Sequence, residues 1–270
     1  MKKRSHFLLL NLMILGYAFI YAPILTLILF SFNKSQVITT WTGFSWKWYQ
    51  ALFSDKMMLN AAFLSLKIAF VSANFAIIIG TIGALVITRF KSFRGKAFLN
   101  GLVTAPLVMP EVMSGLAILL LFVVLQQTFG WPRERGITTI TLGHITLSVA
   151  YVLVIIRARL NEFDHQLEEA ALDLGAKPLT IFFKITLPLI MPSILSGWLL
   201  AFTLSLDDVV IASFLSGPGA TTLPMMIFSS VRFGLSPQIN ALATIIIGIV
   251  ATGVILAGWI NYKTSRSLKI

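Results

Sequence analysis

The sequence predicts an all-α membrane protein with six transmembrane helices, on the grounds of its composition, its hydropathy and the length of its apolar runs. The chain is 57% hydrophobic and only 11% charged, whereas a soluble domain carries about 25% charged residues. Its mean hydropathy is +0.89. With 270 residues, it is long enough for several runs of about 20 apolar residues, the length that spans a bilayer core.

Six apolar runs, separated by short polar segments, define the expected helices. We expect spans at about 7–31, 59–87, 97–125, 137–156, 187–215 and 241–262. Residues 1–270 are therefore interpreted as a single transmembrane domain. The first run follows Lys2, Lys3 and Arg4 but exceeds the roughly 7–15 apolar residues of a signal peptide, so we expect it to remain as a span.

The distribution of Lys and Arg orients these spans. Fourteen of them lie at the N-terminus, between spans two and three, between spans four and five, or at the C-terminus, and six lie in the segments on the opposite side. Because Lys and Arg favour the cytoplasmic side, both termini are expected in the cytoplasm. Lys67 falls inside the second span, and we expect its ammonium to reach the outer interface.

Several classes of function are disfavoured by what the chain lacks. It has no Cys, and His6, His144 and His165 are scattered along it, so no metal site is predicted. It has no G-x-x-x-x-G-K-[ST] motif, so it is not expected to hold ATP in a phosphate loop. The pI near 10.1 does not indicate nucleic-acid binding, because the basic residues lie in short segments between spans.

One segment between spans, at about 157–186, is longer and more polar than a turn requires. Asp164 can cap a helix over about 165–174, and Gly175 fits the left-handed position that follows a helix. Pro178 can open a second short helix, and Pro188 marks the return to the membrane. Five of the ten acidic residues of the chain lie in this segment: Glu162, Asp164, Glu168, Glu169 and Asp173.

A spaced pattern begins in this segment and ends just after it: Glu169-Ala170-Ala171, then Gly175, then Leu187-Pro188. With this spacing, the segment resembles the EAA loop of ABC-importer permease subunits. The resemblance implies a coupling helix that docks into a cleft of an ATP-binding subunit through Glu169, Ala170, Ala171 and Gly175. Small alanines let a partner surface approach, and Glu169 offers a carboxylate. Without the motif, the same residues form a solvated acidic face.

Other stretches resemble the permeases of putrescine and spermidine importers, most of all the second permease subunit of the putrescine systems. They are Tyr21–Pro23, Ser31–Asn33, Ala105–Glu111, Phe202–Asp208 and Ser216–Pro224. The resemblance implies a permease domain that is half of an ATP-driven importer in the bacterial inner membrane, moving putrescine to the cytoplasm by alternating access. Spermidine or another small cation is the alternative cargo.

The same resemblance implies the partners. They are two ATP-binding subunits, which hold ATP and Mg, a second and similar permease subunit, an external substrate-binding protein and the membrane lipid. The chain itself is then not an enzyme, carries no cofactor and binds no nucleic acid.

Three acids, Glu111, Asp207 and Asp208, fall inside predicted spans, where an ionised group usually faces a cavity or a partner. A carboxylate in the pathway would offer charge-assisted hydrogen bonds to a diammonium substrate. Adjacent residues of a helix point about 100° apart, so one Asp is expected in the pathway and the other in a local contact; Glu111 is the second candidate. Alternatively, these acids pair with Lys67 or a sister subunit, or cap a broken helix.

A short pattern recurs in two spans expected to run outward. Pro106 to Pro110 is followed by Ser114-Gly115, and Pro188 to Pro192 by Ser196-Gly197. Either the repeat is chance, or two similarly kinked helices flank one pathway. A secondary transporter is a rival interpretation, but many such carriers are built from inverted repeats and this repeat keeps its direction. An intramembrane aspartyl protease needs acids from separate helices, and Asp207 and Asp208 are adjacent.

Overall fold

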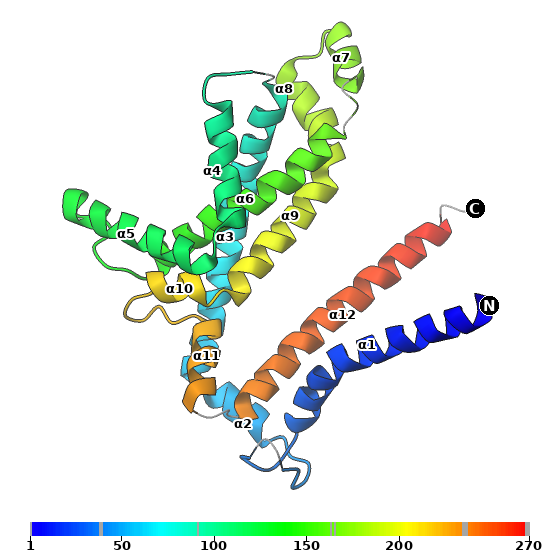
Figure 1. Cartoon of the computed structure of the whole chain (residues 1–270), viewed down its shortest axis with the longest axis vertical. Coiled ribbons are helices and arrows are strands. Elements are labelled where there is room, and N and C mark those ends of the chain that lie inside the picture. Colours follow the sequence, from blue (N-terminus) through cyan, green and yellow to red (C-terminus); the bar gives the residue numbers. More distant parts are fainter. Residues whose placement is uncertain are drawn as a thin grey trace. The chain divides into compact units, whose positions relative to one another are not determined.

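The computed structural model describes residues 2–37, 40–90, 92–162, 164, 166–233 and 237–267, and over these residues the chain is helical, with one isolated β-bridge between Asn33 and Phe44 (Figure 1). The prediction of an all-α protein is confirmed. The chain forms two compact units, unit 1 of residues 1–59 and 227–270 and unit 2 of residues 60–226. That residues 1–270 act as one domain stays a prediction.

Unit 1 contains α1 (Lys2–Phe30), α2 (Lys47–Ser54) and α12 (Pro237–Ser267), and α12 packs against both α1 and α2. The loop after α1 is organised by the buried Asn33. The side-chain amide of Asn33 donates to the backbone carbonyl of Thr40 over 2.7 Å. The backbone carbonyl of Asn33 accepts a hydrogen bond from Nε1 of Trp48 over 2.6 Å. These bonds hold α2 close to the end of α1.

Unit 2 is built around α6 (Ile137–Asn161), which contacts α4, α5, α9 and α10. The remaining elements are α3 (Lys56–Arg89), α4 (Lys96–Val108), α5 (Glu111–Phe129), α7 (Gln166–Asp173), α8 (Pro178–Ile181), the π-helical turn η1 (Phe182–Thr186), α9 (Leu187–Asp207), α10 (Val210–Leu215) and α11 (Leu223–Phe233), which continues into unit 1.

Small residues bring α3 against α6. Ala73, Ala76 and Ala84 are fully buried in one apolar cluster with Val152 of α6. A Cβ added at Gly80 would lie 2.6 Å from Cγ1 of Val152. Helices in a membrane associate by such close packing, because lipid tails are as apolar as the side chains themselves.

Five helices of the described chain are long and apolar enough to cross a membrane: Leu9–Phe30, Lys56–Arg89, Glu111–Phe129, Ile137–Asn161 and Pro178–Asp207. Shorter apolar helices occur at Lys96–Val108 and Pro237–Thr252. The predicted sixth span at 241–262 lies within α12, but its side chains from 253 onward are outside the described residues.

The predicted third span, 97–125, is wrong as one continuous helix, because the chain breaks between α4 and α5. Met109 is extended, with ψ 139°, and α5 begins after Pro110. A proline disfavours the helical conformation of the residue before it and has no N–H for the preceding turn. In the second copy of the proline pattern, Pro192 stays inside a continuous α9, so the two segments are not similarly kinked.

The predicted fifth span, 187–215, also has different limits. Its helix begins at Pro178 and ends at Asp207, and after the extended Asp208 the short α10 begins at Val210. Pro188 cannot donate to the carbonyl four residues earlier. The turn before it widens to η1, in which the Leu187 N–H bonds the Phe182 carbonyl, and the helix continues instead of stopping.

The contact at Gly80 predicts the effect of one added methyl group. We expect Gly80→Ala to lower the free energy of unfolding by about 1–3 kcal/mol, the usual cost of overpacking, because the Leu153 backbone nitrogen also lies 3.2 Å from the added carbon. Thermal unfolding of the purified complex in detergent measures this loss of stability. Gly101→Ala in α4, where nothing lies within 4 Å, is the control and should be neutral or stabilising. Equal midpoints for both variants would contradict the packing described.

Candidate coupling and pathway sites

The predicted loop helix is present as α7, and both of its ends have the expected chemistry. Oδ1 of Asp164 accepts the Gln166 N–H over 3.0 Å, as a capping carboxylate does; His165 lies outside the described residues. Gly175 has φ +80°. Its N–H bonds the Leu172 carbonyl over 2.8 Å, and the next N–H bonds the Ala171 carbonyl over 3.0 Å, the paired bonds of a Schellman motif.

Pro178 opens a second helix, as predicted, but this helix is not a short one within a loop. Residues from Pro178 onward belong to the continuous helix of α8, η1 and α9, so the irregular connection ends at Lys177 and not at about 186. The N-terminal limit also moves, since α6 extends to Asn161. What projects between α6 and the long helix is therefore little more than α7 and its two turns.

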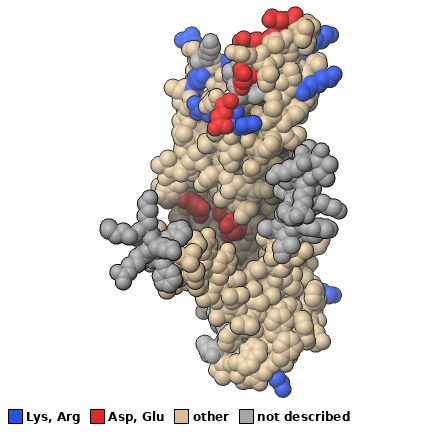
Figure 2. All heavy atoms as spheres, turned by 90° about the vertical axis from the view of Figure 1, so that its right-hand side faces the viewer, with Lys and Arg blue, Asp and Glu red and all other residues tan. Residues whose placement is uncertain are grey.

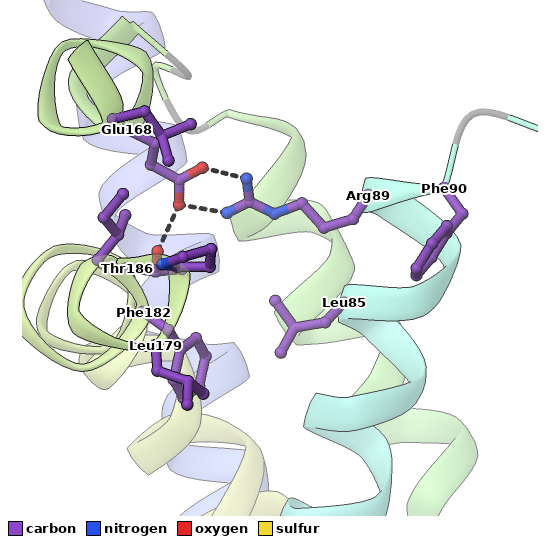
Figure 3. A pocket seen from close by; sticks show the side chains of 10 residues that line it. Leu85, Arg89, Phe90, Glu168, Leu179, Phe182 and Thr186 are labelled. Carbon is purple, nitrogen blue, oxygen red and sulfur yellow. Dashed lines mark hydrogen bonds and ion pairs between the residues drawn. The ribbon is translucent and has the colours of Figure 1, made fainter. Parts of the chain in front are cut away.

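Glu168 fastens α7 to two other helices (Figure 3). The residue is 7% exposed, and its carboxylate forms a bidentate ion pair with the guanidinium of Arg89, the last residue of α3. The hydroxyl of Thr186, at the end of η1, donates to the same carboxylate. A bidentate Arg–carboxylate pair fixes geometry as well as charge, so the position of α7 is tied to α3 and to the start of α9.

We call the contacts of Glu168 with Arg89 and Thr186 the anchor. The residues of the EAA pattern point away from this anchor. Glu169, Ala170 and Gly175 are exposed and Ala171 is half-buried. Leu174 beside them is 88% exposed. Figure 2 shows Lys, Arg and acidic atoms gathered at the end of unit 2 where Figure 1 places α7. α7 therefore has a buried acid on one side and a free surface of small, apolar and acidic residues on the other.

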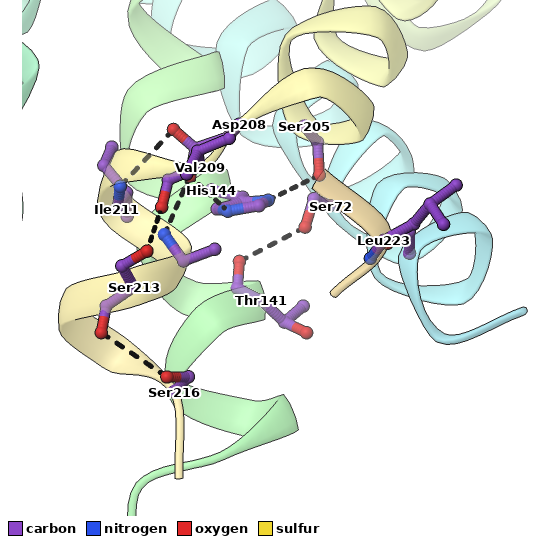
Figure 4. Close-up of polar contacts among 12 residues, drawn as sticks. Ser72, Thr141, His144, Ser205, Asp208, Val209, Ile211, Ser213, Ser216 and Leu223 are labelled. Carbon is purple, nitrogen blue, oxygen red and sulfur yellow. Dashed lines mark hydrogen bonds and ion pairs between the residues drawn. The ribbon is translucent and has the colours of Figure 1, made fainter. Parts of the chain in front are cut away.

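Asp208 occupies the break between α9 and α10 (Figure 4). It is buried, and its Oδ1 accepts the Ala212 N–H over 2.7 Å and lies 3.3 Å from Nε2 of His144. The other ring nitrogen of His144 is 2.6 Å from the hydroxyl of Ser205. The carboxylate thus caps α10 and joins it to α6 and α9, which is the helix-capping alternative raised by the sequence.

Asp207 and Glu111 differ from Asp208 in being exposed. Asp207 is the last residue of α9, and Glu111 is the first residue of α5. α5 packs on α10, where Gly115 faces the ring of Phe214. Both exposed acids consequently lie at helix ends created by the two breaks. Within the described residues, no group of three or more His, Asp or Glu is placed to hold a metal ion.

The sequence alone did not reveal Glu168, Arg89 and Thr186 as a connected set. It also did not reveal His144 as the partner of Asp208, or Ser205 as the partner of His144. Two signals were available for the first set: Glu168 directly precedes the recognised motif, and α3 ends in a basic residue.

Residues 76–270 match the family described as "Binding-protein-dependent transport system inner membrane component". The chain belongs to this family. It is a non-catalytic permease component, located in the inner membrane.

Two curated relatives and one solved structure agree with this assignment. The chain is 56% identical over 255 residues to the putrescine transport system permease protein PotI of Escherichia coli K12, covering 94% of this chain and 91% of that protein. It is 42% identical over 263 residues to the spermidine/putrescine permease PotC of Haemophilus influenzae, covering 97% and 100%. A chain of a bacterial alginate ABC transporter, solved with its ligand-bound periplasmic protein, shares the fold with a TM-score of 0.72 and 18% sequence identity. The match covers 93% of this chain and 91% of that chain.

The anchor predicts that neighbouring acids have different effects on stability. Glu168→Gln should lower the free energy of unfolding by roughly 2–3 kcal/mol, below the 3–5 of a fully buried pair because Arg89 is one-third exposed. Glu169→Gln, on the exposed side, should leave it unchanged. Thermal unfolding of the purified permease chain in detergent, without the ATP-binding subunits, compares the two. If both variants unfold at the wild-type midpoint, Glu168 is not the anchor.

The helix cap predicts a second contrast. Asp208→Ala should cost about 1–2 kcal/mol, the usual loss when an N-cap side chain is removed, whereas Asp208→Asn should retain most of the stability because Asn also caps. Asp207→Ala is the matched control and should be near neutral. Urea or thermal unfolding of the three variants gives the order, and a larger loss for Asp207→Ala would overturn it.

Proposed function

We propose that the chain is one of two permease subunits of an ATP-driven importer that moves putrescine from outside to the cytoplasm by alternating access. The observation that carries this proposal is the 56% identity, across 94% of the chain, to a putrescine permease. The 42% identity to a spermidine/putrescine permease makes spermidine the second candidate cargo.

The remaining parts of the machine are proposed from the family and from the surface of α7. Two ATP-binding subunits, holding ATP and Mg, dock on the exposed face that carries Glu169, Ala170, Ala171 and Gly175. A second, similar permease subunit completes the pathway, and an external binding protein delivers the substrate. Both termini and α7 are cytoplasmic, in agreement with the Lys and Arg count.

The anchor at Glu168 provides a route from ATP to the spans. Movement of α7 is passed by the Arg89 pair to α3 and by Thr186 to α9. α9 is a continuous helix of 21 residues, about 31 Å long at 1.5 Å per residue, and it ends at Asp207. A displacement at the cytoplasmic end is therefore delivered to the position of the exposed acid.

Asp207 is proposed as the pathway acid and Glu111 as the second. Asp207 is exposed, so its carboxylate is available to an ammonium group. Asp208, the other candidate, is buried against its cap and His144, and we assign it the role of holding the break at which Asp207 stands. The contact with substrate has to be weak enough to permit release.

Uptake of labelled putrescine into proteoliposomes, with the reconstituted complex, its binding protein and ATP inside, tests this assignment. We expect Asp207→Asn to reduce uptake about tenfold or more, in line with the loss of one charged hydrogen bond, while ATP hydrolysis continues. Glu134→Gln, an exposed acid in the connection between α5 and α6, is the control for charge alone.

The same vesicles compare the two cargoes by competition with unlabelled spermidine. Normal uptake by Asp207→Asn would remove the acid from the pathway. Absence of both putrescine and spermidine uptake by the wild type would overturn the polyamine assignment.

A further inference from the structure

A groove of about 370 Å³ runs along unit 2 between α3 and α6. The two helices run in the same direction there, since Ser72 donates to the Thr141 carbonyl over 3.3 Å and Gly80 faces Val152 further along. Lys67 and Thr138 lie at one end of the groove, and the apolar side chains of Phe75 and Ile79 continue it along α3. The groove therefore has one polar end and a long apolar body.

Lys67 is the charged residue of this lining, and no acidic residue is among the described residues that form it. Its side chain is exposed. An ammonium group beside apolar surface is stabilised by an anion whose remainder is apolar, and the headgroup of an acidic phospholipid has that chemistry. The positive charge of Lys67 therefore restricts the choice of ligand more than the shape of the groove does.

The dimensions fit one leaflet of a bilayer. Lys67 and Arg89 are separated along α3 by about 33 Å at 1.5 Å per residue, close to the roughly 30 Å of the hydrocarbon core. With Arg89 at one interface, Lys67 therefore lies at the other. From Lys67 to Ile79 the groove extends about 18 Å, comparable with the roughly 15 Å depth of half the core.

We propose that this groove binds an anionic phospholipid, with its phosphate against Lys67 and Thr138 and one acyl chain along Phe75, Ile79 and Ile145. The assignment to the outer leaflet rests on the orientation in the proposed function, but the binding itself does not. The bound lipid covers the surface groove along two helices that are in direct contact with each other and that both take part in the core of unit 2.

The test uses the whole importer complex in nanodiscs that contain a phosphatidylglycerol with a photoactivatable diazirine near the end of one acyl chain. After illumination, mass spectrometry should locate the label on peptides of α3 and α6, near Ile79 and Ile145. Unlabelled phosphatidylglycerol should compete, and phosphatidylcholine should not. Lys67→Gln should reduce labelling about fivefold, the effect of one Lys near a membrane surface. Lys56→Gln, at the first position of α3, should label as the wild type does.

A second variant, Ile145→Trp, fills the groove and should abolish labelling at Ile79 while Lys67 remains. Equal labelling of Lys67→Gln and wild type, or equal competition by the two lipids, would overturn the proposal. A photoreactive residue at position 75 that cross-links to the second permease subunit would also overturn it, because the groove would then be a subunit interface. Putrescine uptake by Lys67→Gln is measured in parallel, so that loss of the lipid and loss of transport are separated.

Discussion

The buried carboxylate of Glu168 is the contact on which the arrangement of unit 2 at its loop end depends. It is shared between the guanidinium at the end of α3 and the hydroxyl of Thr186 at the start of α9. Removing one partner of a buried ion pair leaves an uncompensated charge, which costs several kcal/mol. α7 therefore cannot separate from these two helices at low cost. The proposed coupling role of α7 depends on this attachment, because an unattached acidic segment has no contact through which its movement reaches α3 and α9.

The two breaks in the spans are the second constraint. A broken helix in a membrane leaves backbone groups that have to be satisfied within the protein or by water. Asp208 does this for α10. His144 of α6 lies beside its carboxylate, and Ser205 of α9 hydrogen-bonds the other ring nitrogen of His144. The other break follows Pro110, and α5 begins there with Glu111. Each break presents an exposed acid beside irregular backbone, an arrangement that suits a polar pathway and that a continuous apolar helix does not provide.

Much of the fold was predictable because apolar runs and helix ends are local signals. The ends of α7 followed from Asp164 and Gly175 alone, and both are observed. The break at Pro110 was not predictable, because prolines are tolerated inside membrane helices and the similar Pro192 remains within α9. The roles of Asp208 and Glu168 depended on His144 and Arg89, which are distant in the sequence, so the sequence showed the acids without showing which of them were already paired.

The central claim is that Arg89 and Glu168 transmit the movement of α7, and the number of ATP molecules hydrolysed per putrescine imported tests it most directly. The measurement compares wild type, Arg89→Gln and Arg94→Gln in proteoliposomes with binding protein and saturating ATP. The account predicts that Arg89→Gln continues to hydrolyse ATP but imports less putrescine for each ATP, whereas Arg94→Gln keeps the wild-type ratio. An unchanged ratio in Arg89→Gln would contradict the account, since the movement would then reach the spans without the ion pair.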